Sequence, residues 1–181
     1  MKKKIAPFAF LLVALSIGNS LFAQDTTQKI VSDRRNDKSQ FNKPYVILIS
    51  ADGFRADFTE MYEAKFLQSI SQKGVRAKYM TPSFPSLTFP NHYSIVTGMY
   101  PSHHGLVDNT YFDKASGKQY AMGNKKMVAE GKWYGGTPLW VLAEQQKMMA
   151  ASYYWVASEA DIQGTLPSYY YIYNEKTKIA D

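Results

Sequence analysis

The sequence contains no cysteine and only three histidines, His92, His103 and His104. The lack of cysteine excludes a disulfide framework and a thiolate metal site, so the fold must be stabilised by packing. A zinc site built wholly from this chain would need one or more of the three histidines. Neighbouring residues rarely point at one ion, however, so turn roles for His103 and His104 and a helix role for His92 are the simpler interpretation.

Long apolar runs are also lacking, apart from one near the N-terminus. Three lysines precede the apolar run Ile5–Ile17, and the small residue Ala23 precedes Gln24. This pattern is typical of a secretory signal over residues 1–23, with cleavage after Ser20 as an alternative. An uncleaved anchor is a third interpretation, but the run is shorter than the ~20 residues of a membrane span. We expect an exported protein, periplasmic or secreted, with no stable membrane span after cleavage.

A strong excess of one charge is absent once the signal segment is removed. Loss of its three lysines halves the formal net charge of +6, which gives little support to a nucleic-acid-binding module. Residues 24–43 are rich in Asp, Asn, Gln, Lys and Arg and predict a polar linker whose charges face water. Residues 44–181 suffice for one domain, and the sequence shows no internal repeat. Its fourteen Tyr, ten Phe and three Trp can fill a core or line a pocket.

The apolar, β-branched run Tyr45–Ser50 follows Pro44 and predicts a strand buried on both faces of a sheet. The remaining chain, apart from the aperiodic stretch 110–136, predicts an alternation of helices and strands typical of an α/β fold with a mostly parallel sheet flanked by helices. The first expected elements are a helix over about 60–73 ended by Gly74, a strand at Val75–Met80 and a loop to Pro90. A helix over 91–96 follows and is ended by Gly98. The last elements are a helix capped by Thr137 and opened by Pro138 that runs to about Lys147, and a strand over 150–157.

Two side chains stand where an α/β sheet binds ligands. Asp52 follows the first predicted strand, so its carboxylate should lie in the crevice at the carboxyl end of the sheet, where it could bind zinc or merely hydrogen-bond loop amides. Thr88 should lie at or just before a helix N-terminus. A simple N-cap explains it, but a hydroxyl beside a metal and helix amides could also attack phosphorus.

Other polar residues near these positions have ordinary interpretations. Asn109 could donate a hydrogen bond to a phosphoryl oxygen, although alone it is an ordinary loop asparagine. Arg55 and Asp57 predict a local surface pair.

Three ordered blocks of the sequence are residues 49–57 (ISADGFRAD), 82–93 (PSFPSLTFPNHY) and 97–109 (TGMYPSHHGLVDN). Together they resemble the nucleotide pyrophosphatase/phosphodiesterase family of the alkaline phosphatase superfamily. Residues 131–140 (GKWYGGTPLW), with Tyr154, Trp155, Ser158 and Glu159, resemble the next helix and strand of the family. The resemblance covers roughly residues 43–174 and implies an alkaline-phosphatase-like fold.

The resemblance implies a role for each matching residue. Asp52 corresponds to a zinc ligand, Thr88 to the nucleophile that also bridges the metals, and Asn109 to a phosphate contact. Phe89 corresponds to a wall against the base or leaving group of the substrate, or else is a core side chain. The implied reaction is hydrolysis of a phosphodiester or pyrophosphate bond through a phosphothreonine intermediate, with a nucleotide or other phosphodiester as substrate and two Zn²⁺ ions as cofactors.

One departure from the family pattern leaves alternatives open. The family completes its two-zinc site with Asp and His residues far downstream, and no histidine follows His104 here. We therefore expect residues 44–181 to be the N-terminal part of a catalytic domain, incomplete at the C-terminus, with the remaining metal ligands beyond Asp181. The alternatives are a non-catalytic phosphate- or nucleotide-binding fragment and a hydrolase of the same superfamily acting on phosphonates, phospholipids or phosphomonoesters.

Overall fold

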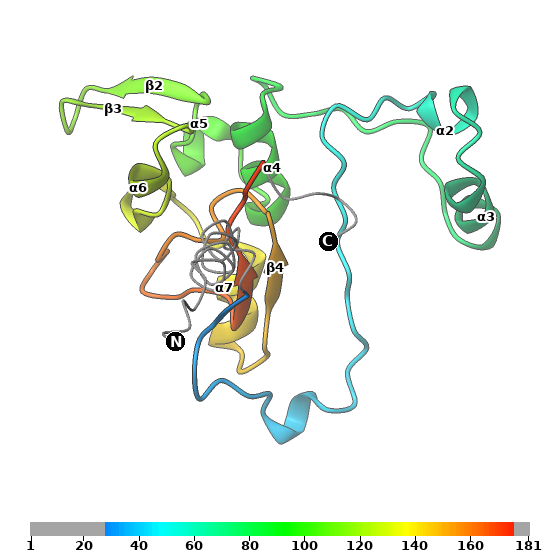
Figure 1. Cartoon of the computed structure of the whole chain (residues 1–181), viewed down its shortest axis with the longest axis horizontal. Helices are drawn as coiled ribbons and strands as arrows, with labels where there is room; N and C mark the ends of the chain where they lie inside the picture. The colour runs from blue at the N-terminus through cyan, green and yellow to red at the C-terminus, as the bar shows by residue number, and fades with distance from the viewer. Residues whose placement is uncertain (1–27, 176–181) are drawn as a thin grey trace, which may run out of the picture.

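The computed structural model describes residues 28–175, so the predicted signal segment and residues 24–27 lie outside the described residues. Short helices and strands joined by long loops make up the described chain (Figure 1). In chain order they are β1 (Lys29–Ile30), η1 (Lys38–Gln40), α2 (Phe58–Met61), α3 (Lys65–Lys73), α4 (Thr88–Thr97), α5 (Pro101–His104), β2 (Thr110–Asp113), β3 (Lys118–Ala121), α6 (Lys125–Val128), η2 (Gly131–Trp133), α7 (Leu139–Gln145), β4 (Ala151–Tyr153) and β5 (Tyr169–Tyr171).

The strands form one small mixed sheet and one hairpin. The sheet has the order β1-β5-β4, with β4 parallel to β5 and β1 antiparallel to it. The predicted strand over 150–157 therefore exists but is limited to residues 151–153. The hairpin of β2 and β3 lies in the stretch 110–136, where the sequence shows no strand alternation.

The hydrophobic core is largely aromatic and lies where α4, the β2–β3 hairpin and α7 meet. Tyr93, Leu106, Tyr120 and Val141 are fully buried. Tyr120 is the centre of a ring cluster, with centroids 5.2 Å from Tyr111 and 5.4 Å from Trp133. The aromatic residues thus provide the buried area that the sequence predicts.

Two strand predictions are wrong. Tyr45–Ser50 and Val75–Met80 form no strand, and Tyr45 and Val75 are almost completely exposed. A strand buried on both faces needs paired neighbours and covering layers, and the described residues place no strand beside either segment. Figure 1 accordingly shows residues 44–57 as an extended trace at one side of the molecule.

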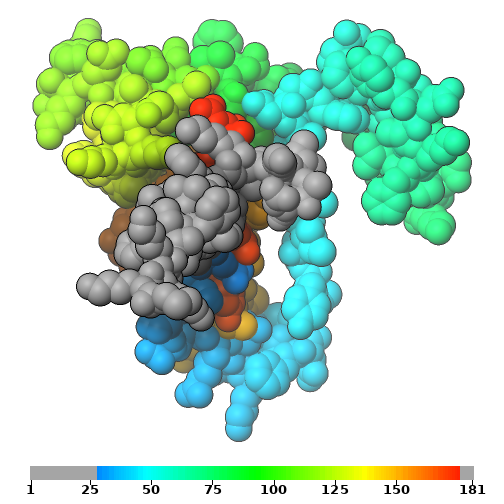
Figure 2. Space-filling view, in the orientation of Figure 1, coloured from blue at the N-terminus to red at the C-terminus, as the bar shows by residue number. Residues whose placement is uncertain are grey.

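The predicted helix over 60–73 is divided in two. Glu63 adopts a positive φ of 47°, which ends α2 before α3 begins at Lys65. Phe66 and Ile70 on α3 are 74% and 49% exposed, so its apolar face is not covered by the described residues. Figure 2 shows this helical pair standing apart from the remaining atoms.

Helix termini agree better with the sequence. α3 ends at Lys73 before Gly74, and α4 ends before Gly98, whose φ of 67° is the left-handed conformation expected of a C-terminal glycine. α7 begins at Leu139, with Pro138 rather than Thr137 at the capping position. Thr137 fails as a cap because its hydroxyl instead accepts a hydrogen bond from Gln163 Nε2 at 3.0 Å.

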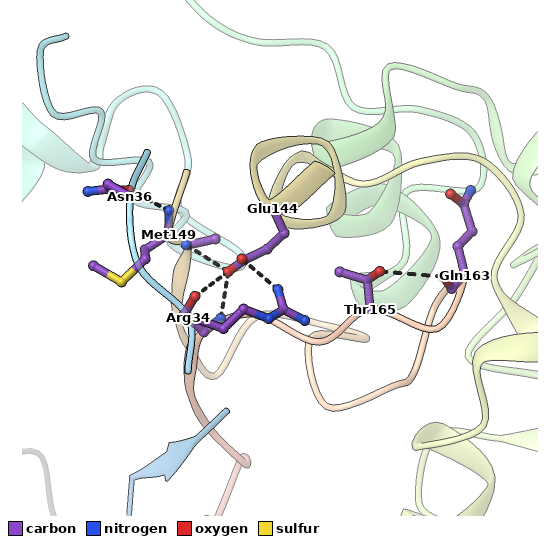
Figure 3. A network of polar contacts seen from close by, with 8 residues as sticks. Arg34, Asn36, Glu144, Met149, Gln163 and Thr165 are labelled. Atoms are coloured by element: carbon purple, nitrogen blue, oxygen red, sulfur yellow. Dashed lines mark hydrogen bonds and ion pairs between the residues drawn. The ribbon is translucent and has the colours of Figure 1, made fainter. Parts of the chain in front are cut away.

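The N-terminal segment 28–43 is mostly exposed, as expected of a polar linker, but it is attached to the sheet. Arg34 Nη1 donates to Glu144 Oε2 at 2.5 Å, and Asn36 Oδ1 accepts from the Met149 amide at 2.6 Å (Figure 3). The boundary at residue 43 stays a prediction. The segment itself is more than a linker, because it contributes strand β1 to the sheet.

Candidate active site

Asp52 lies in a tight turn after the extended segment. The amide of Phe54 donates to Ala51 O at 3.4 Å, and Gly53 has a φ of 66°, which favours glycine at this position. The Asp52 side chain is exposed, and its Oδ2 accepts a hydrogen bond from Thr88 Oγ1 at 2.9 Å. The Asp52 carboxylate thus faces Thr88, the residue that the family resemblance places in the same site.

Thr88 is the first residue of α4, which agrees with its predicted place at a helix N-terminus. The N-cap is Leu87, with extended backbone angles and no side-chain capping bond. The N-cap interpretation of Thr88 is therefore wrong, because its hydroxyl is directed at Asp52 and not at its own helix amides. Pro90 lies in the first turn, where its missing N–H costs nothing.

Asn109 and Phe89 meet beside Thr88. The Phe89 amide donates to Asn109 Oδ1 at 2.9 Å, which orients the Asn109 side chain against the first turn of α4. With Oδ1 so occupied, Asn109 Nδ2 is the group left to donate to a ligand. The Phe89 ring is partly buried and lies 6.5 Å from the Tyr120 ring, so it packs against the core while forming one side of this region.

Two of the three histidines are buried and hydrogen-bonded. His92 on α4 is buried, and its ring lies within hydrogen-bond distance of Ser50 Oγ at 3.0 Å and Thr88 O at 2.8 Å. His104 is 1% exposed and contacts Ser94 Oγ at 3.0 Å, while burial lowers its pKa to about 4. His103 is exposed on α5. The three side chains do not converge.

The residues present fit a metal site only in part. Asp52 Oδ2 and Thr88 Oγ1 are hard oxygen donors of the kind that zinc accepts. Residues 28–175 contain no group of three His, Cys, Asp or Glu side chains that could hold a metal ion. A complete zinc site therefore needs ligands from outside this range.

Acid–base candidates near the site are few. Burial raises the pKa of Tyr111 to about 12, and it also raises the pKa of Tyr120 and of Tyr134, so these phenols stay protonated at neutral pH. Burial likewise raises the pKa of Glu159. Arg55 and Asp57 pair at 2.5 Å on the surface, as predicted, and lie outside the Thr88 contacts.

Comparison with known proteins gives a family match that includes Asp52, Thr88 and Asn109. The family model of type I phosphodiesterase / nucleotide pyrophosphatase matches residues 46–181. The chain is 39% identical over 136 residues to ectonucleotide pyrophosphatase/phosphodiesterase family member 3 of Bos taurus, covering 74% of this chain and 15% of the relative. It is 37% identical over 139 residues to the venom phosphodiesterase of Naja atra, covering 76% of this chain and 17% of the relative.

Solved structures give the fold. Murine ectonucleotide pyrophosphatase/phosphodiesterase 5 superimposes with a TM-score of 0.68 at 29% identity, covering 72% of this chain and 35% of that chain. An inactive Thr-to-Ala variant of that protein in complex with AMP superimposes with a TM-score of 0.69 at 28% identity, covering 73% and 35%. The chain thus spans about a third of the solved relatives and less of the curated ones named above.

The structural match defines an α/β protein with the architecture of the alkaline phosphatase superfamily. Since the family model covers most of its length, the chain belongs to the type I phosphodiesterase / nucleotide pyrophosphatase family.

Sequence reasoning missed two residues of this region. Ser50 and Trp155 both contact His92, Trp155 through Nε1 to His92 O at 3.3 Å. The only available signal for Ser50 is its place two residues before Asp52. The match of Trp155 to the family pattern gave no indication of its contact with His92.

Proposed function

We propose that this chain carries the nucleophile side of an exported, zinc-dependent phosphodiesterase or nucleotide pyrophosphatase. The hydrogen bond of 2.9 Å between Thr88 Oγ1 and Asp52 Oδ2 is the main support, because it brings together the two residues that the family resemblance assigns to nucleophile and metal ligand. The family match and the printed activities of the relatives support the reaction class.

In this proposal Thr88 attacks phosphorus. The Thr88 oxygen forms a bond to phosphorus, and the bond from phosphorus to the leaving-group oxygen breaks with its electron pair going to that oxygen. The Thr88 proton passes through solvent to the leaving group, which departs and leaves a phosphothreonine. Water then cleaves the phosphothreonine and restores the hydroxyl. Asp52 orients the Thr88 hydroxyl, and Asn109 Nδ2 donates to a phosphoryl oxygen as charge develops on it. Phe89 forms a wall for the base or leaving group.

Two Zn²⁺ ions are part of the proposal as expected cofactors. Asp52 and Thr88 would supply oxygen ligands, and the other ligands would come from outside residues 28–175, beyond Asp181 by the family pattern.

The substrate is proposed to be a nucleotide diester or pyrophosphate. The complex of AMP with the inactive Thr-to-Ala variant of murine ectonucleotide pyrophosphatase/phosphodiesterase 5 supports nucleotide binding and a role for threonine. Phosphonates, phospholipids and phosphomonoesters remain the alternative substrates within the superfamily. A second function is phosphate or nucleotide binding without catalysis, and the AMP complex of that inactive variant supports it.

Export is proposed from the N-terminal pattern of residues 1–23. The relatives named as ectonucleotide and venom enzymes support an extracytoplasmic location, periplasmic or secreted. Among residues 28–175 no helix is long and apolar enough to cross a membrane.

The test is hydrolysis of a chromogenic nucleotide phosphodiester, with and without added zinc, by a purified protein that joins these residues to the downstream metal ligands of the family pattern. Wild-type chain, Thr88→Ala and Thr110→Ala are compared, because Thr110 is an exposed threonine outside the site. Zinc-dependent hydrolysis that only Thr88→Ala abolishes is the expected result for an enzyme. Binding of AMP by calorimetry without hydrolysis would support the non-catalytic alternative, and neither activity nor binding would overturn the proposal for this chain.

A further inference from the structure

His92 bridges the two segments that carry the proposed site residues. Its ring nitrogen Nδ1 lies 2.8 Å from Thr88 O, and Nε2 lies 3.0 Å from Ser50 Oγ. Thr88 is the proposed nucleophile, and Ser50 stands two residues before Asp52 in a segment 42 positions away from His92. One buried ring therefore joins the nucleophile helix to the turn of the proposed metal ligand.

The partners of His92 determine the direction of both hydrogen bonds. A carbonyl oxygen can only accept, so Nδ1 must carry the proton and donate to Thr88 O. In the neutral ring Nε2 is then an acceptor, and the Ser50 hydroxyl donates to it. Neither partner can be lost without leaving a ring nitrogen unpaired, and unpaired buried polar groups are costly.

The segment before Asp52 has little else to hold it. Tyr45, Ile47 and Ile49 are 97%, 82% and 85% exposed, so this stretch is not packed into the core. Figure 1 shows it as a single extended trace that reaches the rest of the molecule near α4, and Figure 2 shows it as a separate arm of atoms. Two hydrogen bonds connect this segment to α4: one between Ser50 and His92, and one between Asp52 and Thr88.

Trp155 fixes His92 from the other side. Its indole Nε1 donates to His92 O at 3.3 Å, and the two rings meet edge to face with centroids 5.8 Å apart. Trp155 follows β4 and packs against the core, so His92 is supported by a rigid part of the fold.

We propose that His92 is a positioning residue that holds the Asp52 turn against Thr88 through its hydrogen bond with Ser50. The role in catalysis rests on the function proposed above, whereas the tether itself is a statement about geometry. His92 touches no reacting atom in this scheme and acts through Asp52 and Thr88.

The tether is tested by a distance measurement that needs no activity. The chain has no cysteine, so spin labels attach only at cysteines that are introduced. Ala56→Cys places one label four residues after Asp52, and Ser102→Cys places the other on α5. Both positions are exposed. Pulsed electron resonance should give a narrow distance distribution for the otherwise wild-type chain. Adding Ser50→Ala should abolish the narrow peak.

The matched control uses the second serine–histidine bond of α4. Ser94 Oγ and His104 Nε2 are also 3.0 Å apart, but this pair lies in the core and does not reach the Asp52 turn. Ser94→Ala should lower the melting temperature and leave the distribution narrow. His92→Asn keeps a donor for Thr88 O but is too short for Ser50, so it should behave like Ser50→Ala even if His92→Ala does not fold.

Three results would overturn the tether: a broad distribution in the parent chain, a narrow one in Ser50→Ala, or equal broadening by Ser94→Ala. Where the chain hydrolyses the diester, Ser50→Ala should lower kcat roughly ten- to hundredfold at little cost in melting temperature, because misplaced reacting groups lose rate steeply. Unchanged kcat beside a broadened distribution would overturn the positioning role. Absence of hydrolysis in the protein that carries the complete metal ligand set would count against the proposed function and leave the distance result to decide the tether.

Discussion

Two histidines lie in equally short contact with serines of neighbouring segments, and their surroundings give them different chemistry. His92 joins the core to an exposed arm, whereas His104 is enclosed by α4, α5 and the following loop. The Leu106 amide donates to His104 Nδ1 at 3.2 Å, so the neutral ring must carry its proton on Nε2 and donate to Ser94. A second proton at Nδ1 would break the hydrogen bond from the Leu106 amide.

This enclosure predicts acid sensitivity. Burial lowers the pKa of His104 from an ordinary 6.5 to about 4 in the folded chain. Between these values the unfolded chain binds a proton that the folded chain does not, so stability falls as the pH drops from 7 to 4, by at most about 3 kcal/mol. Urea titrations across this range measure it. In His104→Gln, the fall of the free energy of unfolding with pH should lose the part that His104 contributes. In His103→Gln, the fall should be the same as in the wild type. Equal slopes in all three proteins would contradict the assignment.

A second residue-level prediction concerns the buried phenols. Tyr134 OH donates to Val128 O at 2.9 Å and lies 2.9 Å from Tyr120 OH. Tyr134→Phe leaves both partners unpaired in the core and should lower the free energy of unfolding by about 1–3 kcal/mol. Tyr45→Phe, at a 97% exposed site, is the control and should have no effect in the same urea titration. Equal stability of the two variants would show that the Tyr134 hydroxyl bonds are dispensable.

At the scale of elements, close packing of backbones limits which residues fit. Gly131 opens η2 against the loop that contains Asp161, and a Cβ at Gly131 would lie 2.0 Å from Asp161 O. Neither backbone can move without disturbing the buried Trp133 and Ile162. The contact holds the end of the aromatic core together.

Gly131→Ala should therefore be strongly destabilising. The overlap forces the η2 turn away from the 161 loop, and we expect a loss of at least about 2 kcal/mol, within the range known for overpacking. Thermal unfolding compares it with Gly123→Ala, where a Cβ would meet nothing within 4 Å. A loss of similar size in Gly123→Ala would mean that glycine flexibility, not the close approach, is responsible.

The elements show which features a sequence can predict. α4 was predicted with its C-terminal glycine because Pro90 and Gly98 act locally, through fixed or positive φ angles. The run Tyr45–Ser50 has the composition of a buried strand, but pairing depends on partners that the described residues do not provide. The β2–β3 hairpin is missed because its two strands are only four residues long and largely exposed, so they carry no clear apolar alternation.

The site follows the same division. Family motifs indicated Asp52 and Thr88, and the structure brings them to 2.9 Å. The link through Ser50 and His92 spans 42 residues and depends on tertiary packing, so spacing along the chain could not reveal it. The assigned roles of Asn109 and Phe89 stay predictions that the proposed assays address.

At the scale of the whole molecule, one carboxylate joins three distant parts of the chain. Glu144 on α7 is 5% exposed and accepts from Arg34 in the N-terminal segment, from the Ala150 amide before β4, and from the amide and hydroxyl of Ser168 before β5 (Figure 3). β1 adds to the edge of β5 within the same region. The segment predicted as a linker thus closes the small sheet.

The last prediction separates the two partners of this ion pair. Glu144→Ala removes all four hydrogen bonds and leaves Arg34 and two amides unpaired, so we expect a loss of about 3–5 kcal/mol in urea unfolding. Arg34→Ala should cost less, because Glu144 keeps three of its donors. It should also speed tryptic cleavage after Arg35, since the N-terminal segment is then released from α7. Lys132→Ala, which breaks the exposed pair with Glu130, should change neither quantity. If Arg34→Ala instead costs as much as Glu144→Ala, the hydrogen bonds from Ala150 and Ser168 add nothing measurable to the charge pair.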